Sequence, residues 1–359
     1  MRKKILLMVL LVSALVPRAS GEGVYDPSDE PEGEDRYAYV LADESGARIT
    51  SRCGRIFAGD EYISGDNLLY VVTRVDDEAR VATARLAGEE PSDAAQAFSA
   101  AAEAVKKQIA MYSTHSDESY IPGDGDSSLL KNAGIYDVGE ALKKHLEDLG
   151  VEVSYSHETF FPHDAGAYRR SRAVAASLLK SNPDALIDIH RDGVSADEYE
   201  TKVDGEETSM VRLFVGRTNA NAAENRAFAK RLKSIADEKY PGLVKDIFIG
   251  KGNYNQDLYP EAILLEFGTH EIEKDKAIDS TRYMANVLYD ALYEDAPKDA
   301  QTASKGASKG VAWLIGIAVL AAAVFAAVST GSFRGAGTKM KRTFEEVTGG
   351  AFSGKKRGK

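Results

Sequence analysis

The stretch ALIDIHRD, residues 185–192, is an apolar run that ends in polar and charged side chains. A short apolar run bounded by turn formers is typical of a buried strand. Strand and helix patterns alternate on both sides of it: strand-like runs lie at 109–112, 151–153, 211–215 and 262–265, and helical patterns at 138–149, 168–180, 220–238 and in a last segment that ends at Tyr293. This alternation predicts an α/β fold in which helices cover both faces of a sheet.

The region before this alternation has a different pattern. Short strand-like runs at 37–41, 67–72 and 79–83, separated by turn formers, predict a small antiparallel β module over residues 36–90. It has no group of side chains that suggests catalysis, and we interpret it as a spacer or docking module. The alanine-rich stretch 93–107 is expected to be helical and to lead into the main domain, residues 91–295.

The amino-terminal end has the pattern of a secretory signal peptide. Arg2, Lys3 and Lys4 precede the apolar run 5–16 and the small residues at 19–21. We therefore expect a signal peptide at 1–21, followed by a flexible acidic leader at 22–35.

The carboxyl-terminal end contains a run of 19 residues without a charge, 311–329. As a helix it would be about 28 Å long, close to the hydrocarbon thickness of a bilayer. A flexible linker at 296–310 precedes it, and a basic tail at 330–359 follows it. By the positive-inside rule the tail is cytoplasmic, so the sequence predicts a single-pass protein of the cell membrane with its main domain outside the cytoplasm.

Composition excludes two classes of site. The net charge of −11 argues against nucleic acid as a partner, because binding a polyanion requires a basic surface. Cys53 is the only cysteine, so the chain has no intrachain disulfide and no thiolate metal cluster. Any metal must be held by histidines and carboxylates.

Two histidines, His115 and His190, come directly after strand-like runs. Ligands of open α/β sheets bind at the carboxyl ends of the strands, so both imidazoles are expected in one crevice. Glu118 follows His115 by three residues and can reach the same ion from one loop. A histidine, a glutamate and a distant histidine form a common ligand set of catalytic zinc sites, which keep a fourth position for water.

Glu266 follows a third strand-like run, at the same edge of the predicted sheet. A carboxylate there is suited to accept a proton from zinc-activated water and to return it to the leaving amine. The residues therefore predict a Zn²⁺ hydrolase with Glu266 as its catalytic base.

Four motifs together resemble the stage II sporulation protein P family of endospore-forming bacteria: YSTHSDESY at 112–120, IDIHRD at 187–192, NYNQDL at 253–258 and LEFGTH at 265–270. The resemblance covers residues 109–293. It implies an amidase-like fold and zinc-dependent N-acetylmuramoyl-L-alanine amidase activity on peptidoglycan, often with endopeptidase activity on stem-peptide cross-links. It also implies a role in septal wall removal during engulfment, together with a lytic transglycosylase and a membrane protein partner.

Two features depart from the pattern that the resemblance implies. The broader amidase family takes its glutamate ligand from the start of the helix after the first strand, where this chain has LKN at 130–132. Glu118 is the replacement that we expect, with Glu140 as a weaker alternative. Family members mostly have an amino-terminal anchor, whereas this chain has a carboxyl-terminal apolar run.

Other polar residues near the motifs have two interpretations each. Arg191 and Asp192 either orient His190 or hold a substrate carboxylate, and the simpler alternative is a local ion pair. His270 is a candidate for stabilising the oxyanion of the reaction. His157 and His163 are near the same sheet edge, where a solvated loop is a simpler interpretation than contact with the stem peptide.

The sequence leaves three functions open. The first is an amidase. The second is a zinc carboxypeptidase or endopeptidase that acts on wall peptides, since metallocarboxypeptidases have the same order of ligands. The third is a non-catalytic wall-binding scaffold anchored by its apolar run. The presence of His115, Glu118, His190 and Glu266 disfavours the scaffold.

Overall fold

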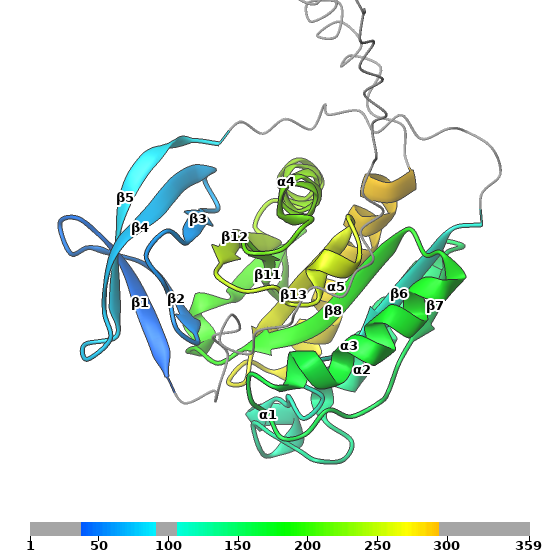
Figure 1. Ribbon diagram of the computed structural model, residues 1–359. Helices are drawn as coiled ribbons and strands as arrows, with labels where there is room; N and C mark the ends of the chain where they lie inside the picture. Colours follow the sequence, from blue (N-terminus) through cyan, green and yellow to red (C-terminus); the bar gives the residue numbers. More distant parts are fainter. Residues whose placement is uncertain (1–36, 91–105, 294–359) are drawn as a thin grey trace, which may run out of the picture. The chain divides into compact units, whose positions relative to one another are not determined.

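A computed structural model describes residues 37–90 and 106–293 (Figure 1). The expected signal peptide, acidic leader, linker, membrane span and basic tail lie outside these residues, as does almost all of the expected helix 93–107. Among the helices within these two ranges, none has the length and hydropathy needed to cross a bilayer.

The described part of the chain is mixed α/β, with an eleven-stranded sheet in the order β2-β1-β5-β4-β3-β12-β11-β13-β8-β6-β7 (Figure 1). Its strands are β1 (Ala38–Asp43), β2 (Arg48–Cys53), β3 (Glu61–Ile63), β4 (Leu68–Asp76), β5 (Val81–Glu89), β6 (Gln108–Tyr112), β7 (Glu152–Tyr155), β8 (Ala185–Asp192), β11 (Val211–Gly216), β12 (Val244–Gly250) and β13 (Ala262–Thr269). A separate hairpin consists of β9 (Glu200–Val203) and β10 (Glu206–Ser209). The helices are α1 (Ile121–Asp124), α2 (Gly134–Asp148), α3 (Ala167–Leu178), α4 (Ala222–Lys239) and α5 (Lys274–Tyr293), with short 3₁₀ turns at Leu179–Ser181, Ala196–Glu198 and Gln256–Leu258.

The two faces of the sheet differ in chemistry because side chains alternate along each strand. On one face, Ile187 and Ile189 of β8 belong to a large apolar core that also contains the buried sides of α2, α4 and α5. On the other face the same strand presents Asp188, His190 and Asp192, all buried. Tyr168 of α3 belongs to a smaller core on this second face. One face therefore stabilises the fold, while the other carries the chemistry.

Strands β1–β5, the expected β module, continue the main sheet. β3 pairs antiparallel with β12, with Tyr62 opposite Phe248. The module also packs on the second face, since Arg52 of β2 lies over the rings of Phe214 and Phe248 at 4.8 and 5.0 Å. The expectation of purely antiparallel pairing is wrong at one position, because the chain returns through β5 to run parallel beside β1.

Most elements of the main domain are found where the sequence predicts them, but β12 and the β9–β10 hairpin are not among the predicted strands. β12 begins with Val244, Lys245 and Asp246, and charged residues of this kind are depleted in strands. Asp246 is tolerated there because it accepts two hydrogen bonds from Arg212 of β11, at 2.7 and 3.0 Å. That pairing joins residues distant in the chain, so local pattern does not reveal it.

Arg212 joins the main sheet to the β module. Its side chain is fully buried, and besides Asp246 it donates to Asp192 at 2.9 Å. It also donates to the Thr50 hydroxyl at 3.1 Å and to the Ser51 carbonyl at 3.0 Å, both on β2. A buried guanidinium with this set of acceptors is compensated in charge and in hydrogen bonding.

Replacing Arg212 with methionine is expected to destabilise the protein by about 3–5 kcal/mol, because buried carboxylates lose their partner. Arg55→Met is the matched control: Arg55 pairs with Asp77, and each side chain is 50% exposed. Its loss should cost less than about 1 kcal/mol. Urea unfolding of both variants measures the difference, and equal stabilities would show that Asp192 and Asp246 do not depend on the guanidinium.

Candidate metal centre

The loop after β6 brings Glu118 between two imidazoles. One carboxylate oxygen, Oε1, lies 3.2 Å from Nδ1 of His115 and 3.2 Å from Nδ1 of His190. The other, Oε2, accepts the backbone N–H of Arg191 at 2.8 Å. All three side chains of this histidine–glutamate cluster (His115, Glu118 and His190) are at most 4% exposed. The structure thus brings together the three residues that the sequence singles out as metal ligands.

Asp188 fixes both the loop and one imidazole. It accepts the backbone N–H of Thr114 at 2.8 Å and the Thr114 hydroxyl at 2.6 Å, which ties the loop to β8. Its Oδ1 is also 3.0 Å from Nε2 of His190. The imidazole of His190 is thus flanked by two carboxylates, Asp188 at Nε2 and Glu118 at Nδ1.

The electrostatics of this cluster suit a cation. Burial raises the pKa of the Glu118 carboxyl, but the charge of His190 and hydrogen bonds from both imidazoles outweigh it and hold this pKa well below its usual range. Burial lowers the pKa of His190, whereas Asp188 and Glu118 raise it, with a net increase well above the usual value. The cluster is therefore built to hold positive charge next to Glu118, either a proton or a metal ion.

The donor set fits zinc. Two imidazole nitrogens and a carboxylate oxygen are ligand types that zinc prefers, and Nδ1 of His115 and Nδ1 of His190 both lie 3.2 Å from the same oxygen of Glu118. A second grouping shares two of these residues: one ligand atom each of His115, Glu118 and His163 lie within 4.8 Å of one another. The two groupings differ in whether His190 or His163 is the third member. We favour His190, because its nitrogen already lies at coordination distance from the Glu118 oxygen.

Glu266 lies next to this cluster. It is the register partner of His190 across the parallel pair β13–β8, so both side chains leave the same face of strands about 4.8 Å apart. Its Oε2 accepts the Tyr199 hydroxyl at 2.8 Å and lies 3.7 Å from Nη1 of Arg212. Burial raises the pKa of the Glu266 carboxyl to about 8 and Asp192 adds to this, against the opposing charge of Arg212. A carboxyl that titrates near neutral pH is suited to exchange protons with a substrate.

Arg191 and Asp192 support the site through different partners, on opposite faces of β8. The Arg191 guanidinium donates to the carbonyls of Ser119 at 3.0 Å and Ser127 at 2.8 Å, which holds the loop around Glu118. The Asp192 carboxylate accepts from Arg212 at 2.9 Å, and its Oδ2 lies 3.0 Å from the Tyr199 hydroxyl, whose single proton it shares with Oε2 of Glu266.

The remaining histidines and Glu140 lie in several different places. His270 is 20% exposed, with its Nε2 3.7 Å from Glu271. His157 pairs with Glu140 at 2.8 Å, and both side chains are about half exposed. Glu118 rather than Glu140 therefore occupies the position between the imidazoles. His163 is only 14% exposed and lies 3.2 Å from Asp117, so the solvated loop expected for it does not describe its surroundings.

Sequence reasoning did not single out four side chains of this region: Asp188, Tyr199, Arg212 and Asp117. Asp188 was detectable, because it precedes His190 by two residues in one strand and so shares its face. The other three have no local signal, since each is defined by a partner that folding brings near.

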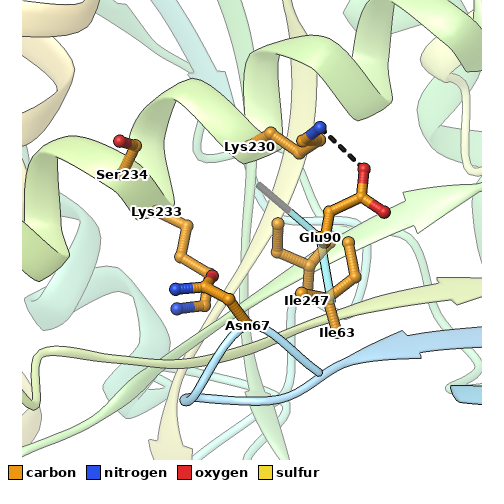
Figure 2. Close-up of a pocket in the computed structure, with 7 residues that line it drawn as sticks. All are labelled: Ile63, Asn67, Glu90, Lys230, Lys233, Ser234 and Ile247. Atoms are coloured by element: carbon orange, nitrogen blue, oxygen red, sulfur yellow. Dashed lines mark ion pairs between the residues drawn. The ribbon is translucent and has the colours of Figure 1, made fainter. Parts of the chain in front are cut away.

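A separate pocket lies between the β module and α4, and it shares no residue with the histidine–glutamate cluster. Its lining comprises Ile63, Asn67, Glu90, Lys230, Lys233, Ser234 and Ile247. Figure 2 shows Lys230 directed toward Glu90, an ion pair of 2.6 Å. Lys233 donates to the Gly65 carbonyl at 2.9 Å and to Asp237 at 2.6 Å, so these lysines stabilise the contact of α4 with the module.

Comparison with solved structures finds N-acetylmuramoyl-L-alanine amidases. AmiC2 of Nostoc punctiforme is 13% identical, with 53% of this chain and 97% of that chain covered and a TM-score of 0.33. The CwlD amidase from Clostridioides difficile, solved in complex with the GerS lipoprotein, is 12% identical, with 52% and 95% covered and a TM-score of 0.34.

Comparison of sequences finds a sporulation protein. The chain is 32% identical over 182 residues to stage II sporulation protein P of Bacillus subtilis (strain 168), and the match covers 45% of each chain. The chain thus aligns with about half the length of that relative. The family described as stage II sporulation protein P (SpoIIP) matches residues 72–289, more than half of the sequence. The matched range includes the second half of β4, all of β5 and the histidine–glutamate cluster. The chain belongs to the stage II sporulation protein P family.

Proposed function

We propose that this chain is a zinc-dependent peptidoglycan hydrolase that cleaves the amide between N-acetylmuramic acid and L-alanine. The observation that carries the proposal is the position of Glu118 between the buried imidazoles of His115 and His190, with Glu266 on the neighbouring strand. Membership in the sporulation protein family supports a role in septal wall remodelling during engulfment.

In this proposal His115, Glu118 and His190 hold the zinc ion. When bound, zinc supplies an acidified water and polarises the scissile carbonyl. Asp188, whose Oδ1 lies 3.0 Å from Nε2 of His190, would orient this imidazole with Nδ1 toward Glu118.

Glu266 accepts the proton of the attacking water and delivers it to the nitrogen of the departing peptide. Its raised pKa favours the second half of this exchange, because a carboxyl that has taken a proton retains it until the amine leaves. Tyr199 and Arg212 both contact the carboxylate through Oε2. Oε1 of Glu266 is then the oxygen that serves the water.

Digestion of purified sacculi with the segment 35–296, with and without a chelator, tests the activity. Separation of glycan strands from intact stem peptides identifies an amidase. Cleavage only within or between stem peptides identifies the zinc carboxypeptidase or endopeptidase alternative, and cleavage of both bonds a dual activity. Binding to sacculi without release of any product would identify the protein as a non-catalytic wall-binding scaffold.

We also propose that the enzyme is a single-pass membrane protein with its catalytic domain outside the cytoplasm. The uncharged run 311–329 and the basic residues after it support this topology. Protease added to intact protoplasts should digest the domain and leave the tail protected. Digestion of a tag on the tail while the membrane is sealed would reverse the orientation.

A lytic transglycosylase and a membrane protein are the partners that we propose for this hydrolase. An amidase detaches stem peptides but leaves glycan strands intact, so complete removal of wall requires an enzyme that cuts glycan. Co-purification from sporulating cells, with the Glu266→Gln variant as bait to retain substrate, would identify them.

A further inference from the structure

His163 comes from the segment between β7 and α3 and lies against the histidine–glutamate cluster. Its ring stacks on that of His115, with centroids 3.9 Å apart and an interplanar angle of 26°. One of its nitrogens, one ligand atom of His115 and one oxygen of Glu118 lie within 4.8 Å of one another. Three potential zinc ligands, His115, Glu118 and His163, therefore lie close together.

Asp117 gives His163 the partner that a metal-bound histidine normally has. Its Oδ1 lies 3.2 Å from Nδ1 of His163, and its Oδ2 accepts the Ser128 hydroxyl at 2.5 Å. A carboxylate at Nδ1 selects the tautomer with its proton there and leaves the lone pair on Nε2. Asp188 likewise lies beside His190, at the ring nitrogen that does not face Glu118.

The segment that carries His163 is held on both sides of it. Arg170 of α3 donates through Nε to the Phe160 carbonyl at 2.7 Å and through Nη2 to Asp164 at 2.6 Å. The Phe160 N–H donates to the Ser116 hydroxyl at 2.9 Å, next to His115. The side chains of Arg170 and Ser116 therefore fix the segment that carries the His163 ring.

We propose that His163 is a fourth protein ligand of the metal, beside His115, Glu118 and His190; the inference rests on the proposed zinc site. With His163 as a fourth protein ligand the site would be closed, since tetrahedral zinc would then have no position left for water. His163, the most exposed of the three histidines, would be the ligand to make way for water and substrate.

The test is the number of histidines bound to the metal. The full-length protein in detergent is loaded with Co²⁺, and the exchangeable imidazole N–H signals shifted by the paramagnetic ion are counted by proton NMR. Wild type should give three signals and His163→Ala two. His157→Ala, which removes an exposed histidine of the same segment, is the matched control and should keep three.

The outcomes separate this inference from the proposed function. Wild type could instead give two signals, of which His115→Ala removes one and His190→Ala the other. That result would overturn the assignment of His163 as a fourth ligand and leave the proposed zinc site intact. Three signals that persist in His163→Ala would also overturn it. A wild-type chain that binds neither Co²⁺ nor Zn²⁺ would contradict the proposed function, and this inference with it. The wild-type count decides the matter even if His163→Ala fails to fold.

Discussion

Glu266→Gln is expected to retain its zinc and to lose turnover by roughly 10²- to 10⁴-fold, the usual contribution of general acid–base catalysis. The amide keeps the size of the carboxylate and still accepts the Tyr199 hydroxyl at the same position, but it cannot take a proton. The fold and the metal should be unaffected, because Glu266 belongs to a neighbouring strand and not to the loop that carries His115 and Glu118.

Zinc content and the rate of sacculus digestion, measured on the same preparation, check this expectation. Glu271→Gln is the matched control, since Glu271 lies just beyond the same strand and its side chain is 48% exposed. It should digest sacculi at the wild-type rate. Wild-type turnover in Glu266→Gln would leave the proposed reaction without its base.

The second large effect is expected from the proposed ligands. His115→Ala and His190→Ala should each lose zinc and abolish hydrolysis, because the remaining side chains hold the ion too weakly. Glu118→Gln should lose zinc as well, since a neutral amide is a poorer ligand than the carboxylate now shared by both imidazoles.

Metal analysis of the folded variants decides these assignments, with His157→Ala as a control outside the cluster. Full zinc occupancy in His115→Ala or His190→Ala would remove that residue from the ligand set. If Glu266→Gln lost zinc while Glu118→Gln retained it, the roles of the two glutamates would have to be exchanged.

The parts of the site that sequence predicts are those with a local signal. His115 follows β6 by three residues, while His190 and Glu266 lie within β8 and β13, each directly after the apolar run of its strand. The alternation of strands and helices brings these positions to one region of the sheet. Glu118 is found because it lies three residues from His115, within one turn of the same loop.

The parts that sequence does not predict depend on long-range partners. β12 contains Asp246, which is unfavourable in a strand until Arg212 lies beside it. His163 has no periodic pattern around it, and its place against His115 follows from Arg170 and Ser116 holding its segment. The β module contains no catalytic group, yet Thr50 and Ser51 hold the arginine next to Glu266.

The pairing of β3 with β12 has a consequence for any attempt to work with the catalytic half alone. Without the module, β12 would become an edge strand whose exposed N–H and C=O groups are free to pair with another chain. Phe214 and Phe248, which Arg52 now covers, would add an apolar surface beside that edge. We therefore expect the truncated half to aggregate. By pairing with β12, the module keeps the main sheet from associating with other chains.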